Sequence, residues 1–196
     1  MEVRRAGVED LDRLTDLLTE AFGGDPLWRW AFPEQRDLRA WWRFCVGSAL
    51  RYPWVWVAGD FEAASVWIPP DGEELTEGEE AQVEPLLRGL IGDRTSDVLE
   101  LLERFGQSHP RRQPHYYLSL LGVADRCRGR GIGMSLLAEN LGRIDAEGSA
   151  AFLESSNPAN NARYGQAGFV RVGEFKTPDN ARTVATMWRS PQQRSA

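Results

Sequence analysis

The chain has 196 residues, of which 42% are hydrophobic and 27% are charged, and its formal net charge is −6. This length suits one α/β domain with a core of its own, and the composition is ordinary for a soluble globular protein. The acidic balance argues against nucleic acid as the main partner, because phosphate binding requires a basic surface. It agrees better with a cationic substrate such as an amine, which a negative surface attracts over a long range.

The segment Val3–Phe22 is rich in charged residues, so it is neither a signal peptide nor a membrane span. No other stretch approaches the roughly 20 apolar residues that cross a bilayer. We therefore expect a cytoplasmic protein without membrane contact. Cys45 and Cys127 form no C-x-x-C pair and His109 and His115 add no ligand spacing, so neither a metal site nor a disulfide is expected.

Hydrophobic spacing predicts the elements of the first half. In chain order we expect a short strand at Glu2–Arg5, a helix at Asp10–Phe22, a break at Gly23–Pro26, a loop-like segment at Leu27–Phe32, a helix at Arg36–Leu50, and a hairpin of strands Trp54–Ala58 and Ala64–Ile68 joined by the turn Gly59-Asp60. An acidic, exposed stretch at Glu73–Glu84 follows, with helices at about Ala81–Leu90 and Asp93–Phe105.

The second half opens with a nearly continuous apolar run, His115–Val123, which is typical of a central strand buried on both faces. After a glycine-rich loop we expect a helix at Ile132–Glu147, a strand at Ala150–Glu154, a helix at Asn160–Gln166, a strand to about Phe175, a strand at Thr183–Trp188 and a frayed tail after Pro191. No linker or repeat divides the chain. One mixed α/β domain over residues 1–196 is therefore predicted.

The loop Arg128-Gly129-Arg130-Gly131-Ile132-Gly133 is the sharpest local feature. Glycines let backbone N–H groups converge on a ligand, and the start of the following helix adds partial positive charge, so the loop suits a phosphate. The two arginines strengthen that preference. The alternative is a tight turn that binds nothing. P-loop spacing fails because no Lys-Ser or Lys-Thr follows, and dinucleotide spacing fails because Met134 and Leu136 stand where glycine is needed.

The sequence resembles the GNAT superfamily of N-acetyltransferases in two motifs. Arg128-x-x-Gly131-x-Gly133 matches the pyrophosphate-binding pattern R/Q-x-x-G-x-G/A of that family, and it follows a strand ending Leu121-Gly122-Val123. Downstream, the residues Asn157, Tyr164 and Gly168-Phe169 match the pattern N-x₆-Y-x₃-G-F. Two motifs in the right order are far more specific than either alone.

The stretches Tyr117–Gly133 and Phe152–Ser156 further resemble the puromycin N-acetyltransferase branch. The first half matches that branch only in layout, and it is where the family builds its acceptor site, so puromycin itself is not implied. Two positions depart from the family pattern. Asn160 stands where Ala is frequent and could take over a polar contact to the cofactor, and Arg163 stands where Leu is frequent.

The resemblance implies a mixed, mostly antiparallel sheet with a splayed central parallel strand pair flanked by helices. It also implies acetyl-CoA as co-substrate, bound on the side formed by about residues 115–175. Backbone groups of Leu121, Gly122 and Val123 would pair with the pantetheine arm, and the amides of Gly129 to Gly133 would hold the pyrophosphate. Asn157 and Asn160 complete the predicted cofactor contacts.

By the same resemblance, Tyr164 is the candidate acid that protonates the leaving thiolate. Glu154, at the end of an apolar strand where burial raises a carboxyl pKa, is the candidate base. Each residue also has a purely structural interpretation. Tyr164 is then a core tyrosine, and Glu154 is a carboxylate that is solvated or paired with an arginine. His115 and Glu62 are lesser candidates for the base.

Two features of the acceptor half are left open. Four tryptophans either line an acceptor pocket or form the core of the helical layer: Trp28, Trp30, Trp41 and Trp42. The acidic run Glu73–Glu84 is either a solvated surface, which we favour, or a rim that attracts substrate.

We therefore expect an acetyltransferase that acts on a small-molecule amine, as a monomer or homodimer without nucleic acid or membrane partners. The alternatives are a protein or peptide N-acetyltransferase and a non-catalytic CoA-binding sensor.

Overall fold

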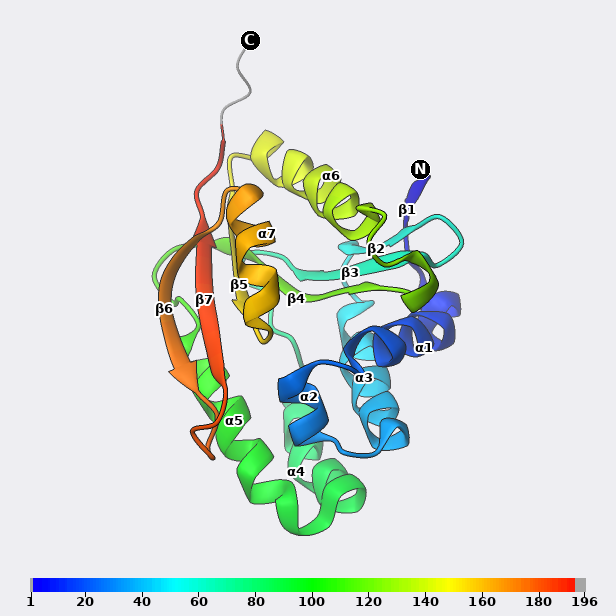
Figure 1. Ribbon diagram of the computed structural model, residues 1–196, viewed down its shortest axis with the longest axis vertical. Coiled ribbons are helices and arrows are strands. Elements are labelled where there is room, and N and C mark those ends of the chain that lie inside the picture. Colours follow the sequence, from blue (N-terminus) through cyan, green and yellow to red (C-terminus); the bar gives the residue numbers. More distant parts are fainter. Residues whose placement is uncertain (1, 193–196) are drawn as a thin grey trace.

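Seven strands form one mixed sheet through the molecule (Figure 1). The computed structural model describes residues 2–192. The strands are β1 (Val3–Arg5), β2 (Val55–Ala58), β3 (Ala63–Ile68), β4 (His115–Val123), β5 (Ala150–Ser155), β6 (Val170–Lys176) and β7 (Thr183–Arg189). Their order in the sheet is β1-β2-β3-β4-β5-β7-β6, and among the described strands β4 and β5 are the parallel pair while the other neighbours are antiparallel. The predicted mixed α/β class is confirmed.

The parallel pair separates halfway along β4. Its register runs from His115 opposite Ala150 to Leu118 opposite Leu153, and β4 then continues to Val123 without β5. On its other edge β4 stays paired with β3 as far as Val123 opposite Ala63. The register with β3 shifts at the same level, where Ser119 is an extra residue on β4. Such a bulge bends a strand, and the predicted splay is confirmed.

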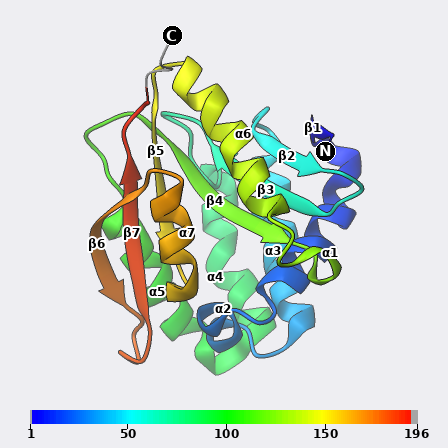
Figure 2. The same ribbon diagram turned by 45° about the horizontal axis from the view of Figure 1, so that its top comes forward.

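The side chains of β2 alternate between two hydrophobic cores, as the pleat of a strand requires. Val55 and Val57 belong to a core covered by α1 (Leu11–Phe22), α3 (Gln35–Ala49), α4 (Glu77–Ile91) and α5 (Thr95–Ser108). Trp56 and Ala58 belong to a second core against α6 (Ile132–Ala146). Figure 2 shows α6 crossing the sheet in front of β3 and β4, with α7 (Asn161–Gln166) beside β5 and β7.

The segment that we expected to be a loop, Leu27–Phe32, is instead helix α2 (Pro26–Ala31). Asp25 caps it, because its carboxylate accepts hydrogen bonds from the N–H groups of Leu27 and Trp28 at 2.9 and 3.2 Å. Proline is well suited to the first helical position. The Asp-Pro pair is thus a helix start, and interpreting it only as a break was wrong.

Among the other boundaries that differ from the prediction, two have a clear physical reason. The β2–β3 hairpin turns through residues 59–62 rather than through Gly59-Asp60 alone, with positive φ angles of 55° at Gly59 and 54° at Phe61. Helix α4 begins at Glu77 instead of Ala81, because Thr76 and Glu79 form a reciprocal capping box. The residues 193–196 of the expected frayed tail lie outside the described part of the chain. Within residues 2–192, no helix has the length and apolar character needed to cross a bilayer.

Candidate active site

The splay leaves one edge of β4 open at Leu121 and Val123. The N–H of Ala124 donates to the carbonyl of Glu62 at 2.9 Å, so Ala124 faces β3. Backbone groups alternate along a strand, so those of Gly122 also face β3, while those of Leu121 and Val123 point to the side that β5 has left. Unpaired backbone groups need partners, and this edge can therefore pair with an extended ligand.

Gly122 allows α1 to pack closely on β4 and does not contribute to the open edge. A Cβ atom there would lie 2.9 Å from Cδ2 of Leu18 and 3.0 Å from Cβ of Ala21. Distances this short are avoided by real Cβ atoms, so a side chain would push α1 away from β4. Among the three predicted residues of this strand, Leu121 and Val123 thus offer their backbone groups and Gly122 lets the helix approach.

The glycine loop between β4 and α6 has an open, strained shape. Gly129 and Gly131 adopt φ angles of 77° and 76°, which favour glycine, and a Cβ on either would meet nothing within 4 Å. Gly131 is the N-cap of α6 and gives no side-chain cap to the first turn. Within the described residues, no backbone acceptor takes the N–H groups of residues 129–131. The loop therefore has the free amides and the space that an anion requires.

The two loop arginines already have partners inside the protein. The guanidinium of Arg128 contacts Asp125 at 2.8 Å and donates to the carbonyl of Ala21 at 2.9 Å. Arg130 lies 3.4 Å from the carboxylate of Glu62 on the β2–β3 turn. Both arginine side chains are about half exposed. They position the loop against neighbouring elements, and Glu62, a lesser candidate for the base, is paired there.

A cavity of about 1050 Å³ lies beside the open edge. It brings together four of the predicted site residues, which are Leu121, Glu154, Asn160 and Tyr164. The other predicted cofactor residues do not line it, and the glycine loop lies at the far end of β4. This separation matches a ligand that has its reactive end in the cavity and an anionic group at the loop.

Tyr164, on α7, is half-buried and lies edge to face against Phe169 at a centroid distance of 6.2 Å. Burial raises the pKa of its phenol to about 12, and the nearby carboxylate of Asp25 adds to this effect. Asp25 also accepts a hydrogen bond from the hydroxyl of Ser156 at 2.8 Å. The phenol is therefore protonated at neutral pH and available as a proton donor to the cavity.

Glu154 is the next-to-last residue of β5, and its side chain is 2% exposed. Burial raises the pKa of its carboxyl group, although His109 and Tyr117 act in the opposite direction. One oxygen, Oε1, lies 3.8 Å from Nδ1 of His109, and the other, Oε2, is buried with no hydrogen-bond partner in the described residues. A buried carboxyl group that lines the cavity and has a raised pKa fits a general base.

The two asparagines have different local roles. Asn157 caps the 3₁₀ turn Pro158–Asn160, because its Oδ1 accepts from the N–H of Ala159 at 3.1 Å. Asn160 accepts a hydrogen bond from Arg163 at 3.0 Å and lines the cavity. Asn157 therefore shapes the turn that follows β5, and Asn160 is the one placed to touch a ligand in the cavity.

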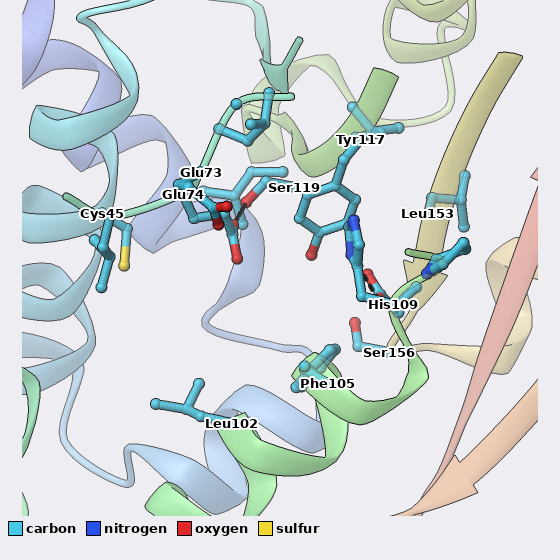
Figure 3. A pocket seen from close by; sticks show the side chains of 18 of the residues that line it. Cys45, Glu73, Glu74, Leu102, Phe105, His109, Tyr117, Ser119, Leu153 and Ser156 are labelled. Atoms are coloured by element: carbon cyan, nitrogen blue, oxygen red, sulfur yellow. Dashed lines mark hydrogen bonds and ion pairs between the residues drawn. The ribbon is translucent and has the colours of Figure 1, made fainter. Parts of the chain in front are cut away.

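Sequence reasoning missed several residues of this cavity (Figure 3). The carboxylate of Glu74 accepts a hydrogen bond from Ser119 at 2.6 Å, directly at the bulge in β4. Partial loss of solvent within the cavity and the charge of Glu154 raise the pKa of Glu74, although the residue as a whole is exposed. His109 and the buried phenol of Tyr117 face Glu154. The acidic run is mostly exposed, as we favoured, and its exposed residue Glu74 also lines the cavity.

The tryptophans divide between the two roles that we considered. Trp28, Trp41 and Trp42 are buried members of the first core and also line the cavity. Trp28 contacts Trp42 edge to face at 4.6 Å and stacks on Phe105 at 6.3 Å. Trp30 packs against that core without lining the cavity. The aromatic wall is thus rigid core surface rather than a set of free side chains.

Comparison with known proteins agrees with this geometry. Residues 105–187 match the family described as Acetyltransferase (GNAT) domain. Among solved structures, the chain is similar to the histone acetyltransferase HPA2 and related acetyltransferase from Corynebacterium glutamicum, with 24% identity and a TM-score of 0.70 over 99% of this chain and 98% of the other. An agmatine N-acetyltransferase has 18% identity and a TM-score of 0.66 over 96% and 98%. The C-terminal condensation domain of Ebony has 11% identity and a TM-score of 0.71 over 96% and 98%.

These similarities extend over nearly the whole chain, and at such identities they establish the shared fold. The matched family domain contains β4, the glycine loop, α6, β5 and α7, which are the elements that build the site. Residues 105–187, which build the site, therefore match a GNAT acetyltransferase domain, and this match together with the shared fold supports an enzyme of the N-acetyltransferase class.

Proposed function

We propose that this enzyme transfers the acetyl group of acetyl-CoA to the primary amine of a small molecule by direct attack. The observation that carries the proposal is the meeting of Glu154, Tyr164 and the open backbone of Leu121 at one cavity. A base, an acid and an oriented amide are the three groups that amide formation from a thioester needs.

The chain's residues fit the co-substrate in a defined order. Free amides of residues 129–133 at the start of α6 suit the pyrophosphate, and the edge of Leu121 and Val123 suits the pantetheine arm. An amide on this edge that donates to the thioester oxygen would stabilise the oxyanion of the transition state by about 3 kcal/mol. The side formed by residues 115–175 would thus hold the co-substrate, and the N-terminal half would hold the acceptor.

The proton chemistry follows from the two buried side chains. An alkylamine is almost wholly protonated at neutral pH, so it must lose a proton before it can attack. Glu154 accepts that proton, and its raised pKa brings it closer to the amine in basicity. Tyr164, with a pKa of about 12, donates a proton to the departing thiolate.

The acceptor side of the cavity favours a cation. Seven carboxylate side chains line the cavity against two arginines, and aromatic faces of the first core lie among them. Negative charge and aromatic faces together attract an ammonium group. A small acceptor also fits the similarity to an agmatine N-acetyltransferase, whereas the similarity to a protein named as a histone acetyltransferase supports the peptide alternative.

Thiol release from acetyl-CoA, measured across small amines and peptides with free amino groups, tests the proposal. We expect turnover with small amines that carry positive charge. Turnover restricted to peptides would support the protein N-acetyltransferase, and tight CoA binding without turnover on any acceptor would support the sensor. Failure of the protein to bind CoA in calorimetry would overturn all three.

The remaining predictions stand on the sequence. We propose a cytoplasmic enzyme with a single domain, active as a monomer or homodimer. A closer relationship to the puromycin N-acetyltransferase branch is proposed on the stretches Tyr117–Gly133 and Phe152–Ser156.

A further inference from the structure

A chain of side chains leads from Glu154 to two histidines. Oε1 of Glu154 lies 3.8 Å from Nδ1 of His109, and Nε2 of His109 lies 3.1 Å from Nε2 of His115. Nδ1 of His115 in turn lies 2.7 Å from the carbonyl oxygen of Gln113. These residues come from the end of β5, from the segment after α5 and from the start of β4, so the fold alone brings them together.

The contacts fix which nitrogen atoms carry protons. A carbonyl oxygen only accepts, so Nδ1 of His115 is the N–H that donates to Gln113. Burial lowers the pKa of His115, which favours its neutral form, and its Nε2 is then an acceptor. Nε2 of His109 must therefore be an N–H donor. The remaining nitrogen of His109, Nδ1, is left with a lone pair that faces Glu154 when His109 is neutral.

Aromatic side chains hold the ring of His109 in this orientation. It lies edge to face against Tyr117 at a centroid distance of 4.8 Å and against Phe152 at 5.1 Å. The His109 side chain is 33% exposed, whereas Glu154 is 2% exposed. His109 is thus the member of the pair that can exchange a proton with solvent.

We propose that His109 takes over the proton that Glu154 receives from the acceptor, and that His115 keeps His109 in the tautomer that can do so. This inference rests on the proposed function. His109 acts through Glu154 and is therefore a positioning residue rather than a catalytic one.

The proton balance is simple. The N–H bond of the ammonium breaks and an O–H bond forms on Glu154, which leaves the amine neutral. The O–H bond then breaks and an N–H bond forms at Nδ1 of His109, so that carboxylate and imidazolium remain. Water at the exposed side of His109 removes that proton. The 3.8 Å separation exceeds a hydrogen bond, and catalytic contacts often shorten when the substrate binds.

The charged and titratable groups around the pair come from two other elements. Tyr117 on β4 faces Glu154, and Glu74, in the segment before α4, adds a negative charge. His115 contacts His109 from the start of β4. Glu74 and Glu154 both lie close enough to His109 for a positive charge on its ring to lower their carboxyl pKa values, which supports transfer in the proposed direction.

The histidine ring signals in NMR spectra test the pairing without any turnover. The chain has only two histidines, so a His109→Gln variant assigns both signals. We expect Glu154→Gln to shift the ring signals of His109, because the carboxyl group beside its Nδ1 is replaced by an amide. Unchanged His109 signals would overturn the pairing, whether or not the protein acetylates amines.

The pH profile of kcat/KM then tests the relay in the active enzyme. We expect His109→Gln to lower kcat/KM about tenfold at pH 7 and to move the acid limb to higher pH, because the buried carboxyl group of Glu154 loses its counter-charge. Added imidazole should restore activity to His109→Ala. Gln107→Ala, an exposed position two residues before His109 and outside the cavity, is the matched control for folding. An unshifted acid limb together with no rescue by imidazole would show that His109 only packs, and would overturn the proposal.

Discussion

A Cβ atom on Gly133 would lie only 2.6 Å from Cγ2 of Val123, so the first turn of α6 rests directly on the end of β4. Val123 is one of the two residues whose backbone faces the side that β5 leaves open. This contact therefore couples the position of the glycine loop to that of the open edge. A ligand that spans the loop and the edge therefore depends on the absence of a side chain at Gly133.

Gly133→Ala tests this coupling. The added methyl group must push α6 from β4, which costs about 1–3 kcal/mol of unfolding free energy and displaces the amides of the loop. We expect CoA affinity, measured by calorimetry, to fall about tenfold or more. Gly142→Ala, in the same helix with nothing within 4 Å of the added Cβ, is the control and should leave affinity unchanged. Equal affinity in the two variants would contradict the coupling.

Tyr164→Phe removes the phenol while keeping the ring that packs on Phe169. We expect kcat to fall about 100-fold with CoA affinity nearly unchanged, because the leaving thiolate loses its proton donor. The pKa of about 12 predicts in addition that Tyr164 causes no loss of activity in the wild-type enzyme between pH 7 and about pH 10. A variant kcat within twofold of wild type would remove this residue from the mechanism.

Glu74→Gln tests the cationic acceptor. The change removes a carboxylate beside Ser119 that has no cationic partner among the described residues. We expect the KM for charged amines to rise about tenfold and the KM for acetyl-CoA to stay constant, as assayed at low and high salt. Glu77→Gln, an exposed carboxylate outside the cavity, is the matched control. A rise in the KM for acetyl-CoA instead would place Glu74 on the co-substrate side.

Glu154→Gln is expected to stabilise the fold while it lowers activity. Burial raises the pKa of Glu154 in the folded state, so ionisation at neutral pH opposes folding. This unfavourable contribution is absent below the unfolded pKa of about 4 and grows as the pH rises through the folded value. We expect the variant Tm to exceed that of wild type by about 2 °C or more at pH 8, with a smaller gap at pH 4. A Tm that falls at pH 8 would indicate a structural role.

The ion pair between Asp145 and Arg189 is a stability determinant far from the cavity. It joins α6 to β7 through contacts of 2.6 and 2.8 Å, and the arginine is 4% exposed. Burial would raise the pKa of Asp145, but hydrogen bonds from Arg189 and the Gln192 amide outweigh it and lower that pKa. The contribution is therefore present above the unfolded pKa of about 4 and lost as the pH falls through the folded value.

We expect Asp145→Ala to lower the free energy of unfolding by about 3 kcal/mol at pH 7, because it leaves a buried guanidinium unpaired. Urea unfolding at pH 7 and pH 3 measures this, and the difference from wild type should narrow at the lower pH. A difference that is the same at both pH values would show that packing, not charge, holds this contact.

The elements with strong local signals were predictable. The apolar run of β4 matches its observed bounds, His115–Val123, and the glycine loop begins α6 at Ile132 as expected. Helix α2 was missed because an Asp-Pro pair occurs both at breaks between elements and at the start of helices. Only the hydrogen bonds from the N–H groups of Leu27 and Trp28 to Asp25 show that a helix starts here. The start of α4 was missed because the acidic composition of residues 73–84 suggested an exposed loop. The capping box of Thr76 and Glu79 within that stretch instead begins a helix.

The candidate site was predictable only in part. Glu154 and Tyr164 lie near motifs in the sequence, and the structure places both at one cavity. Glu74 and His109 have no such signal, because each reaches the cavity from a segment whose local sequence is an ordinary turn or helix end. Their contacts with Ser119 and Glu154 join residues far apart along the chain.

The sequence by itself predicted the class of fold, the shape of the glycine loop and the resemblance to acetyltransferases, because periodicity, glycine spacing and short motifs are properties of neighbouring residues. The tertiary structure decided which side chains surround the cavity, which atoms of the two histidines face each other and where negative charge collects. Those properties depend on burial and on distances between separate elements, and they arise only when β4 and β5 part and the helices close around the gap.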